Sequence, residues 1–334
     1  MVAATTQGTF EGETPIEVQT FAGPMFRSAL AETCGRRPSY EDAYAISSQE
    51  DRASLWVFDG HRGDSAARYA ADVFSNEEFG RNKGNPSLPC NKKILGAFQS
   101  IDRNLREHFC SKKIKAAGTT AVGAMVIRQN DGTYSTKLVN CGDSRAVVIR
   151  SPNETKQSAA NVKVKLPECL DRIRLMVNAN WSEEASWLPD WPAVVETIDH
   201  KPNFWLERAR IEAAGGKVLG GRCSRVDGNL AVSRTIGDFD FKGDERRTVA
   251  EQKVSCLPDI YEVTGMPEGS VVLLACDGLW DVMSSEDAAV FVRERLQREP
   301  PMELDEIAEE LISFSLNAQT GDNVTVLLTQ LGRH

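Results

Sequence analysis

Apolar side chains recur at helical spacing in two stretches of the first third of the chain. They fall in residues 66–74 and 94–109, and the second stripe consists of Ile94, Phe98, Ile101, Leu105 and Phe109. The period then changes to that of strands, because residues 119–128, 134–141 and 145–150 are short and rich in β-forming side chains. Two helices followed by a series of strands predict antiparallel sheets with helices outside them, an α+β fold.

Further strands and helices are predicted on either side of this region. Apolar runs bounded by polar or turn residues predict strands at residues 43–46, 55–58, 271–276 and 324–328. Asn203 and Ser284 stand where helix caps are found, and Asp287 completes the capping pattern of the second helix. A last helix is indicated by apolar positions at Leu304, Ile307, Ala308 and Leu311.

Domain boundaries are only weakly marked. Residues 1–24 are small, polar and rich in threonine, which predicts a flexible N-terminal tail. Residues 25–332 contain no repeat and no linker rich in proline or serine, and we expect them to form a single domain. Within it, residues 151–195 break the pattern, as a surface insertion does. This insertion is interpreted either as a neutral loop or as a docking surface, because it contains Trp181, Trp187 and Trp191.

The charge and the cysteine usage limit the classes of partner. The 334-residue chain has a formal net charge of −9 and no run of basic residues, which argues against nucleic acid as a partner. Its eight cysteines form no closely spaced pair, and no secretory leader or apolar segment of membrane-spanning length is recognisable. We therefore expect a soluble, reduced, cytoplasmic monomer without membrane contact, with the nucleus as an alternative location.

Acidic residues stand next to the ends of the predicted strands. Those that follow a strand are Asp59, Asp143 and Asp277, and those that precede one are Glu41, Asp42 and Asp322. In a two-sheet sandwich such positions can gather at one end, where the carboxylates would repel and raise one another's pKa. A divalent cation removes that cost, and ligands that are all oxygens favour magnesium or manganese over zinc.

The residues Asp59-Gly60-His61 bring a carboxylate and an imidazole to the end of one predicted strand. His61 is the only one of the four histidines that stands beside a candidate metal ligand, and imidazole can carry a proton near neutral pH. The alternative is that Asp-Gly is turn chemistry, which is the commoner explanation of any single occurrence. Only the coincidence of several such positions favours a metal centre.

Nine blocks, in order between residues 36 and 328, resemble the metal-dependent serine/threonine protein phosphatases of type 2C. The blocks are RPSYED at 37–42, FDGH at 58–61, AAGTTAV at 116–122, NCGDSRAV at 140–147, DHKP at 199–202, EAAGGKV at 212–218, GNLAVSRTIGDFDFK at 228–242, ACDGLWDV at 275–282 and DNVTVLL at 322–328. A single Asp-Gly would be weak support, whereas nine ordered blocks over nearly the whole predicted domain are a specific signal.

The resemblance implies both a fold and an activity. The fold would be a central sandwich of two mainly antiparallel β-sheets flanked by pairs of antiparallel helices, in agreement with the layering predicted above. The activity would be hydrolysis of phosphoserine and phosphothreonine in phosphorylated protein substrates by a water that two metal ions activate, without a covalent intermediate. The ions would be manganese or magnesium, two per site, with a third bound more weakly.

The resemblance also assigns roles to individual residues. Asp59 would bridge the two ions, and Gly60 would bind one of them through its backbone carbonyl. The other metal positions would be Glu41, Asp277 and Asp322 as direct ligands, Asp42 as the residue that orients a bound water, and Asp143 and Asp281 at the weaker third ion. Arg37 would hold the substrate phosphate with its planar fork of donors, and His61 would protonate the leaving alkoxide.

Three positions depart from the family pattern. Arg62 stands where the family usually has glycine, and if the position needs a positive φ, arginine would cost roughly 1–2 kcal/mol there. Arg62 is interpreted either as tolerated at the surface or as a second cation beside the site. Tyr40 replaces a methionine before the Glu-Asp pair, which indicates a packing change. Residues 151–195 are longer than the usual link between the GDSR and DHKP blocks.

Three rival functions remain at this stage. A pseudophosphatase, catalytically weak or acting only as a binding module, would keep the fold without efficient turnover, although every metal position is retained here. A phosphatase with an aspartyl nucleophile needs a second Asp two residues after the first, whereas Asp59 is followed by Gly60-His61 and Asp277 by Gly278-Leu279. A metal-dependent nuclease is disfavoured by the acidic balance, but hydrolysis of a small phosphoester is not.

Overall fold

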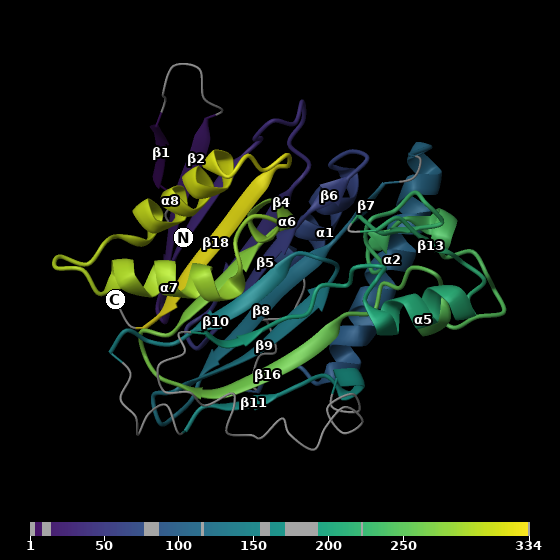
Figure 1. Cartoon of the computed structure of the whole chain (residues 1–334). Helices are drawn as coiled ribbons and strands as arrows, with labels where there is room; N and C mark the ends of the chain where they lie inside the picture. Colours follow the sequence, from purple (N-terminus) through teal and green to yellow (C-terminus); the bar gives the residue numbers. More distant parts are fainter. Residues whose placement is uncertain are drawn as a thin grey trace.

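The computed structural model describes residues 4–8, 15–76, 87–114, 117–153, 161–170, 193–221 and 223–332. Within these residues most strands belong to two large sheets, one of seven strands and one of six (Figure 1). Every pairing between neighbouring strands of these two sheets is antiparallel. The structure therefore confirms the predicted α+β class.

The order of strands in the two sheets differs from their order in the chain. The larger sheet runs β1 (Ala4–Gly8), β2 (Ile16–Gly23), β3 (Phe26–Thr33), β18 (Val324–Leu331), β17 (Val271–Ala275), β10 (Arg145–Ile149) and β12 (Ala193–Glu196). The smaller sheet runs β11 (Lys163–Lys165), β16 (Asp259–Met266), β9 (Tyr134–Cys141), β8 (Ala121–Arg128), β5 (Arg52–Phe58) and β4 (Ala43–Ser48). Central strands of both sheets thus come from distant parts of the sequence.

Helices cover the outer face of each sheet. The smaller sheet packs against α1 (Ser65–Asn76) and α2 (Asn91–Lys112) through a cluster of buried side chains from all of these elements. The larger sheet packs in the same way against α7 (Ser285–Leu296) and α8 (Leu304–Asn317). A third buried cluster lies between the sheets. The layers therefore run helix, sheet, sheet, helix, and Figure 1 shows the two helix pairs on opposite sides of the sheets.

Strand β5 shows how side-chain alternation serves both faces of a sheet. Leu55 and Val57 belong to the core between the sheets, whereas Trp56 and Phe58 belong to the core beneath α1 and α2. All seven residues of the strand are buried. A strand that is buried on both faces has a continuous apolar sequence, and this pattern allowed the strand to be predicted.

The predicted series of strands divides between the two sheets. Strands β8 and β9 pair with each other in the smaller sheet. The turn at Gly142-Asp143-Ser144 then carries the chain across to the larger sheet, where β10 pairs with β17. The predicted strands of residues 119–150 are therefore split between the two sheets, and the crossing places Asp143 at the junction of the sheets.

Two local predictions were wrong. Residues 16–23 of the predicted tail form β2, which pairs with β3 through seven residue pairs from Glu17–Glu32 to Gly23–Phe26. The helix α5 (Trp205–Ala213) is capped at Phe204 without a side-chain hydrogen bond, so Asn203 is not its N-cap. By contrast, the Ser284 hydroxyl accepts a hydrogen bond from the Asp287 amide, as predicted. The stripe on α2 is buried as predicted.

The described residues include only part of the predicted insertion. Trp181, Trp187 and Trp191 lie outside the described residues, so the docking hypothesis stays a prediction. The single domain over residues 25–332 likewise stays a prediction. Across the parts of the chain that are described, none of the helices has both the length and the apolar character needed to span a membrane.

Candidate metal centre

Three carboxylates meet where strands of both sheets end. Asp59 follows β5 and Asp143 follows β9 in the smaller sheet, whereas Asp277 follows β17 in the larger one. Each offers one oxygen, and these three oxygens all lie within 4.8 Å of one another. Asp277 is also the first residue of the short helix α6 (Asp277–Trp280). The structure thus brings together three acids that are far apart in the sequence.

Burial and mutual repulsion make this cluster costly without a cation. Burial, followed by the charges of Asp277 and Asp42, raises the pKa of Asp59 well above its usual range. Burial and the charge of Asp143 raise the pKa of Asp277 in the same way. A divalent ion would offset both effects, because its positive charge balances the negative charge that the buried carboxylates bring together. The donor set of carboxylate oxygens fits magnesium or manganese.

The turn that carries Asp59 is fixed by threonine side chains. The Thr120 hydroxyl accepts a hydrogen bond from the Asp59 amide at 3.2 Å, and the Thr119 hydroxyl donates to the Asp59 carbonyl at 3.0 Å. The Thr120 hydroxyl also lies 2.7 Å from that of Ser144, which follows Asp143. Residues of the AAGTTAV and NCGDSRAV blocks therefore hold the Asp59 and Asp143 turns at a fixed separation.

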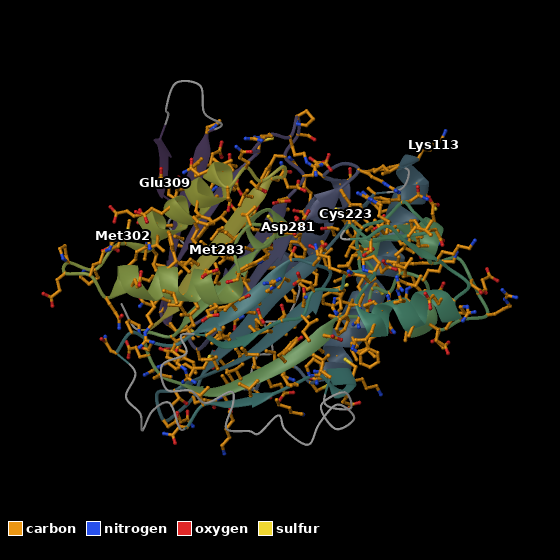
Figure 2. The ribbon with its side chains drawn as sticks, viewed as in Figure 1. Lys113, Cys223, Asp281, Met283, Met302 and Glu309 are labelled. Carbon is orange, nitrogen blue, oxygen red and sulfur yellow. The ribbon has the colours of Figure 1, made fainter. Side chains whose placement is uncertain are left out.

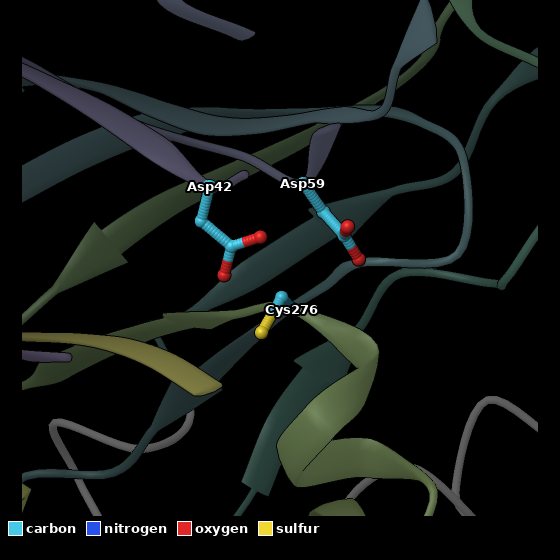
Figure 3. Close-up of side chains that lie close together, drawn as sticks. All are labelled: Asp42, Asp59 and Cys276. Carbon is cyan, nitrogen blue, oxygen red and sulfur yellow. The ribbon is translucent and has the colours of Figure 1, made fainter. Parts of the chain in front are cut away.

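A second group of possible ligand atoms lies beside the first. Asp42, Asp59 and Cys276 each offer one atom, and these atoms also lie within 4.8 Å of one another. Figure 3 shows both carboxylates directed toward the side of the cluster where the Cys276 thiol lies. Asp42 accepts a hydrogen bond from the Thr325 hydroxyl at 2.6 Å, and burial raises its pKa to about 7. The apolar run in which Cys276 stands indicates a structural thiol and gives no sign of its place beside two acids.

Gly60 and Glu41 are packed together at the edge of the cluster. A Cβ atom at Gly60 would lie 2.3 Å from the Glu41 carbonyl oxygen, so a larger residue would push the two segments apart. The Glu41 carboxylate accepts hydrogen bonds from the Ser39 hydroxyl at 2.9 Å and from the Gly63 amide at 3.0 Å. Among the described residues, Glu41 belongs to neither of the two groups of clustered ligand atoms.

Arg37 and Asp322 form an ion pair at the rim of the centre. The Arg37 guanidinium donates from Nη2 to the Asp322 carboxylate at 2.7 Å and from Nε to the Gly321 carbonyl at 2.9 Å. The Arg37 side chain is 53% exposed, so it is accessible to a ligand in solution. Asp322 is near enough to raise the pKa values of both Asp42 and Asp59, although it belongs to neither group of clustered atoms.

Lys201 is a cation of the centre that the sequence analysis did not single out. Its ammonium lies 2.7 Å from the Asp143 carboxylate, 3.8 Å from that of Asp277 and 3.7 Å from that of Asp281. Figure 2 shows Asp281 near the middle of the molecule, on the C-terminal side of α6. Lys201 stands in the DHKP block, so the resemblance contained the only signal for it.

His61 is paired with a second residue that the sequence analysis did not single out, Asp238. The Nε2 atom of His61 lies 2.7 Å from the Asp238 carboxylate, whose side chain is completely buried. The strands β6 (Gly60–His61), β7 (Gly118–Thr119) and β15 (Ile236–Gly237) form a small sheet that brings the two together. A Cβ atom at Gly118 would lie 2.1 Å from Asp238 Oδ2, which explains the glycine there.

Asp238 is held as a carboxylate despite its burial. Burial alone would raise its pKa, but the hydrogen bond and charge of His61, with the charge of Lys242, hold the pKa below its usual range. Lys242 in turn donates to Asp102 on α2 at 2.7 Å and to the Thr235 carbonyl at 2.7 Å. The GDFDFK block is therefore anchored to α2 by a buried ion pair.

Comparison with known proteins identifies the family. The sequence profile of protein phosphatase 2C matches residues 20–175 and 194–324. The chain belongs to the protein phosphatase 2C family. Human protein phosphatase 1A is 32% identical over 320 residues, which cover 92% of this chain and 71% of the human protein. Bovine protein phosphatase 1B is 31% identical over 325 residues, which cover 92% of this chain and 57% of the relative.

Solved structures agree with this assignment at the level of the fold. A phosphatase from Toxoplasma gondii superposes with a TM-score of 0.74 at 23% identity, and the match covers 96% of each chain. The Mycobacterium tuberculosis serine/threonine phosphatase PstP/Ppp has a TM-score of 0.53 at 19% identity, over 93% of this chain and 100% of that one.

Family membership decides the class of activity. The chain is a metal-dependent serine/threonine protein phosphatase, as the resemblance implied. The profile leaves out residues 176–193, which lie within the predicted insertion. An acidic residue stands at each predicted metal position that would use a side chain, whereas Arg62, at φ 61°, stands where the family usually has glycine. The positive φ on which the predicted cost of arginine depends is therefore present at this position.

Proposed function

We propose that this phosphatase hydrolyses phosphoserine and phosphothreonine side chains with a water activated by two manganese or magnesium ions, without a covalent intermediate. The main support for the proposal is that carboxylate oxygens of Asp59, Asp143 and Asp277 lie within 4.8 Å of one another. Their negative charges repel one another there. When bound, such a pair of ions lowers the pKa of water and neutralises the phosphate.

Several residues of the chain would bind the ions, each in a different role. We assign the bridging position to Asp59, carbonyl ligation to Gly60, and further ligation to Glu41, Asp277 and Asp322. The hydrogen bonds that Glu41 accepts are compatible with this, because a carboxylate has about four lone-pair positions and two are used. Asp42, fixed by Thr325, would orient the attacking water. Asp143 and Asp281 would serve a weaker third ion.

Two residues would act on the substrate directly. Arg37 is tethered to Asp322 and Gly321 through Nη2 and Nε, and its exposed guanidinium can still donate to a phosphate oxygen. His61 would give a proton to the leaving serine or threonine oxygen, which is a poor leaving group as an alkoxide. A positioned general acid of this kind contributes about 10²–10⁴-fold to a rate. Asp238 fixes the orientation of the imidazole ring through Nε2.

The metal centre can be tested with an isosteric variant. Asp277→Asn removes one charge of the cluster with little change in shape, and we expect it to lower both the affinity for manganese and the turnover of a phosphothreonine peptide. Glu309→Gln is the matched control, because Glu309 is an exposed acid on α8 (Figure 2). Metal binding is measured by calorimetry on chelator-treated protein, and turnover by phosphate release.

The outcome separates the proposal from its rivals. Unchanged metal affinity and full turnover in Asp277→Asn would refute the assignment of Asp277. Metal binding without turnover above a metal-free blank, in the unaltered protein, would favour a catalytically weak binding module. Trapping of an acyl-phosphate on Asp59 or Asp277 would favour the aspartyl mechanism.

A further inference from the structure

The ammonium of Lys201 occupies the carboxylate cluster where a third ion would bind. It lies 2.7 Å from Asp143, and the carboxylates of Asp277 and Asp281 lie 3.8 and 3.7 Å away. The Lys201 side chain is 33% exposed, whereas that of Asp143 is only 7% exposed. Within the described residues, Asp143 has no other ion pair with a basic side chain. One cation of the protein's own thus already offsets part of the negative charge of these acids.

The backbone around Lys201 is clamped against the turn that carries Asp143. The preceding residue, His200, donates from its amide to the Gly142 carbonyl at 2.9 Å, and its Nδ1 accepts from the Gly142 amide at 3.1 Å. Its Nε2 lies 3.2 Å from the buried carboxylate of Asp259. The backbone at Lys201 is therefore held opposite Asp143, because hydrogen bonds fix the residue before it.

The charge of Lys201 is stabilised by these acids. Burial alone would lower its pKa, but the charges of Asp143, Asp277 and Asp281 raise it well above the ordinary range. A divalent ion on a carboxylate oxygen approaches to about 2.1 Å. It would then compete with the ammonium for the same Asp143 oxygens, and the two positive charges would repel each other.

A cavity next to the cluster offers the ammonium a second position. Lys201 lines a cavity of about 460 Å³ together with Glu196 and Asp199. Asp199 is paired with Arg145 at 2.8 Å, whereas Glu196 lies 3.8 Å from Arg145 and has a side chain that is 55% exposed. A lysine displaced from Asp143 would thus find other carboxylates and solvent within reach of its flexible stem.

We propose that Lys201 is a tethered cation that holds the place of the third divalent ion at Asp143 and Asp281, so that this ion binds only when the ammonium leaves. The inference rests on the proposed metal centre and deepens it. It explains why a third ion would bind more weakly than the other two, since it must displace a cation that the fold has already placed. Lys201 is a positioning residue in this scheme, because it acts through the carboxylates.

Neutral substitution of Lys201 should tighten binding of the third ion. In calorimetric titrations of the full chain with manganese alone, we expect Lys201→Met and Lys201→Gln to bind the third ion at least tenfold more tightly than the unaltered protein. Lys201→Arg keeps the charge and should bind it weakly. Lys253→Met is the matched control, because Lys253 is also 33% exposed and, in the part of the chain that the structure describes, pairs with a single acid, Asp227, at 2.8 Å. Adding Asp143→Asn to Lys201→Met should abolish the gain.

A second measurement needs no variant. Labelling of lysines by an amine-specific reagent, read by mass spectrometry, should increase at Lys201 as manganese is raised through the range where the third ion binds. Lys253 serves as the internal reference and should keep a constant reactivity. Constant reactivity of Lys201, with three ions bound, would overturn the proposal.

The results distinguish this inference from the proposed function. If the unaltered protein binds fewer than two ions, the two-ion centre itself fails. If the unaltered protein binds two ions, but neither Lys201→Met nor Lys201→Gln binds the third ion more tightly, only the proposed role of Lys201 is overturned. Thermal unfolding without metal checks that each variant is folded, and a variant that does not fold leaves the labelling experiment to decide.

Discussion

The Nε2 atom of His61 lies 2.7 Å from Oδ2 of Asp238, although the two residues are 177 positions apart in the sequence. The Asp238 side chain is completely buried, whereas that of His61 is 26% exposed. The pair thus has one buried member and one that solvent can reach. Such an arrangement fixes the ring while leaving its other nitrogen available, as a general acid requires.

If Asp238 acts by positioning His61, the two residues should form one functional unit. We expect His61→Ala to lower kcat by on the order of 10²-fold for alkyl phosphates, and much less for an activated aryl phosphate whose leaving group needs little protonation. Asp238→Asn should show the same dependence on the leaving group with a smaller loss, while KM changes little.

A double-mutant cycle distinguishes positioning from a general loss of structure. Asp238→Asn introduced into His61→Ala should produce no further loss of kcat, because the ring that it orients is gone. Equal losses for alkyl and aryl phosphates, or additive losses in the double variant, would contradict the assignment. Thermal unfolding of each variant provides the control for folding.

Arg37 should contribute to phosphate binding more than to the chemical step. Arg37→Lys keeps a positive charge beside Asp322 but removes the planar fork, so KM for a phosphothreonine peptide should rise by roughly tenfold with a smaller change in kcat. Inorganic phosphate offers an independent check as a competitive inhibitor, and its inhibition constant should rise in parallel. An unchanged inhibition constant would exclude phosphate contact by Arg37.

Arg62 should cost stability through its backbone rather than its side chain. It adopts φ 61°, a conformation that costs a residue with a Cβ atom roughly 1–2 kcal/mol compared with glycine. Arg62→Gly and Arg62→Ala both remove the side chain, so the difference between them isolates the backbone. We expect the glycine variant to be more stable by about 1 kcal/mol in urea unfolding, since glycine's greater unfolded-state entropy offsets part of the gain.

The activity of these two variants tests the alternative role of Arg62. Turnover close to that of the unaltered protein in both variants would identify Arg62 as a tolerated surface residue. A similar loss of turnover in both would instead show that the guanidinium acts as a second cation beside the site.

Glu207 should make stability depend on pH in the acid range. Burial alone would raise its pKa, but Arg234, His200 and Arg210 lower it from 4.5 to about 2. Because the folded pKa is the lower one, the contribution is complete above pH 4.5 and is lost as the pH falls toward 2. The shift corresponds to about 3 kcal/mol.

The matching experiment compares Glu207→Gln with the unaltered protein across this window. Urea unfolding at pH 7 should show a loss of about 3 kcal/mol in the variant, and the two proteins should converge as the pH approaches 2. Glu309→Gln, at an exposed position on α8, should follow the unaltered protein throughout. A constant difference at all pH values would show that the ion pairs of Glu207 with Arg234 and Arg210 are not the cause.

The sequence by itself determined the class of fold and the positions of the acids along the strands. Strand β5 is apolar on both faces, and α2 carries one apolar stripe, so short-range pattern was enough to find them. Asp59, Asp143 and Asp277 could be placed at strand ends for the same reason. The resemblance then supplied their roles, which the pattern alone left open.

Only the tertiary structure decided which residues meet. Strand β2 has few buried positions and is held by its pairing with β3, so its own sequence carries little signal. The crossing between sheets at Asp143 depends on which strands become neighbours, and that choice is made by the whole core. The partners of His61 and Asp143 lie 177 and 58 residues away, and local spacing does not report distances between side chains that folding alone brings together.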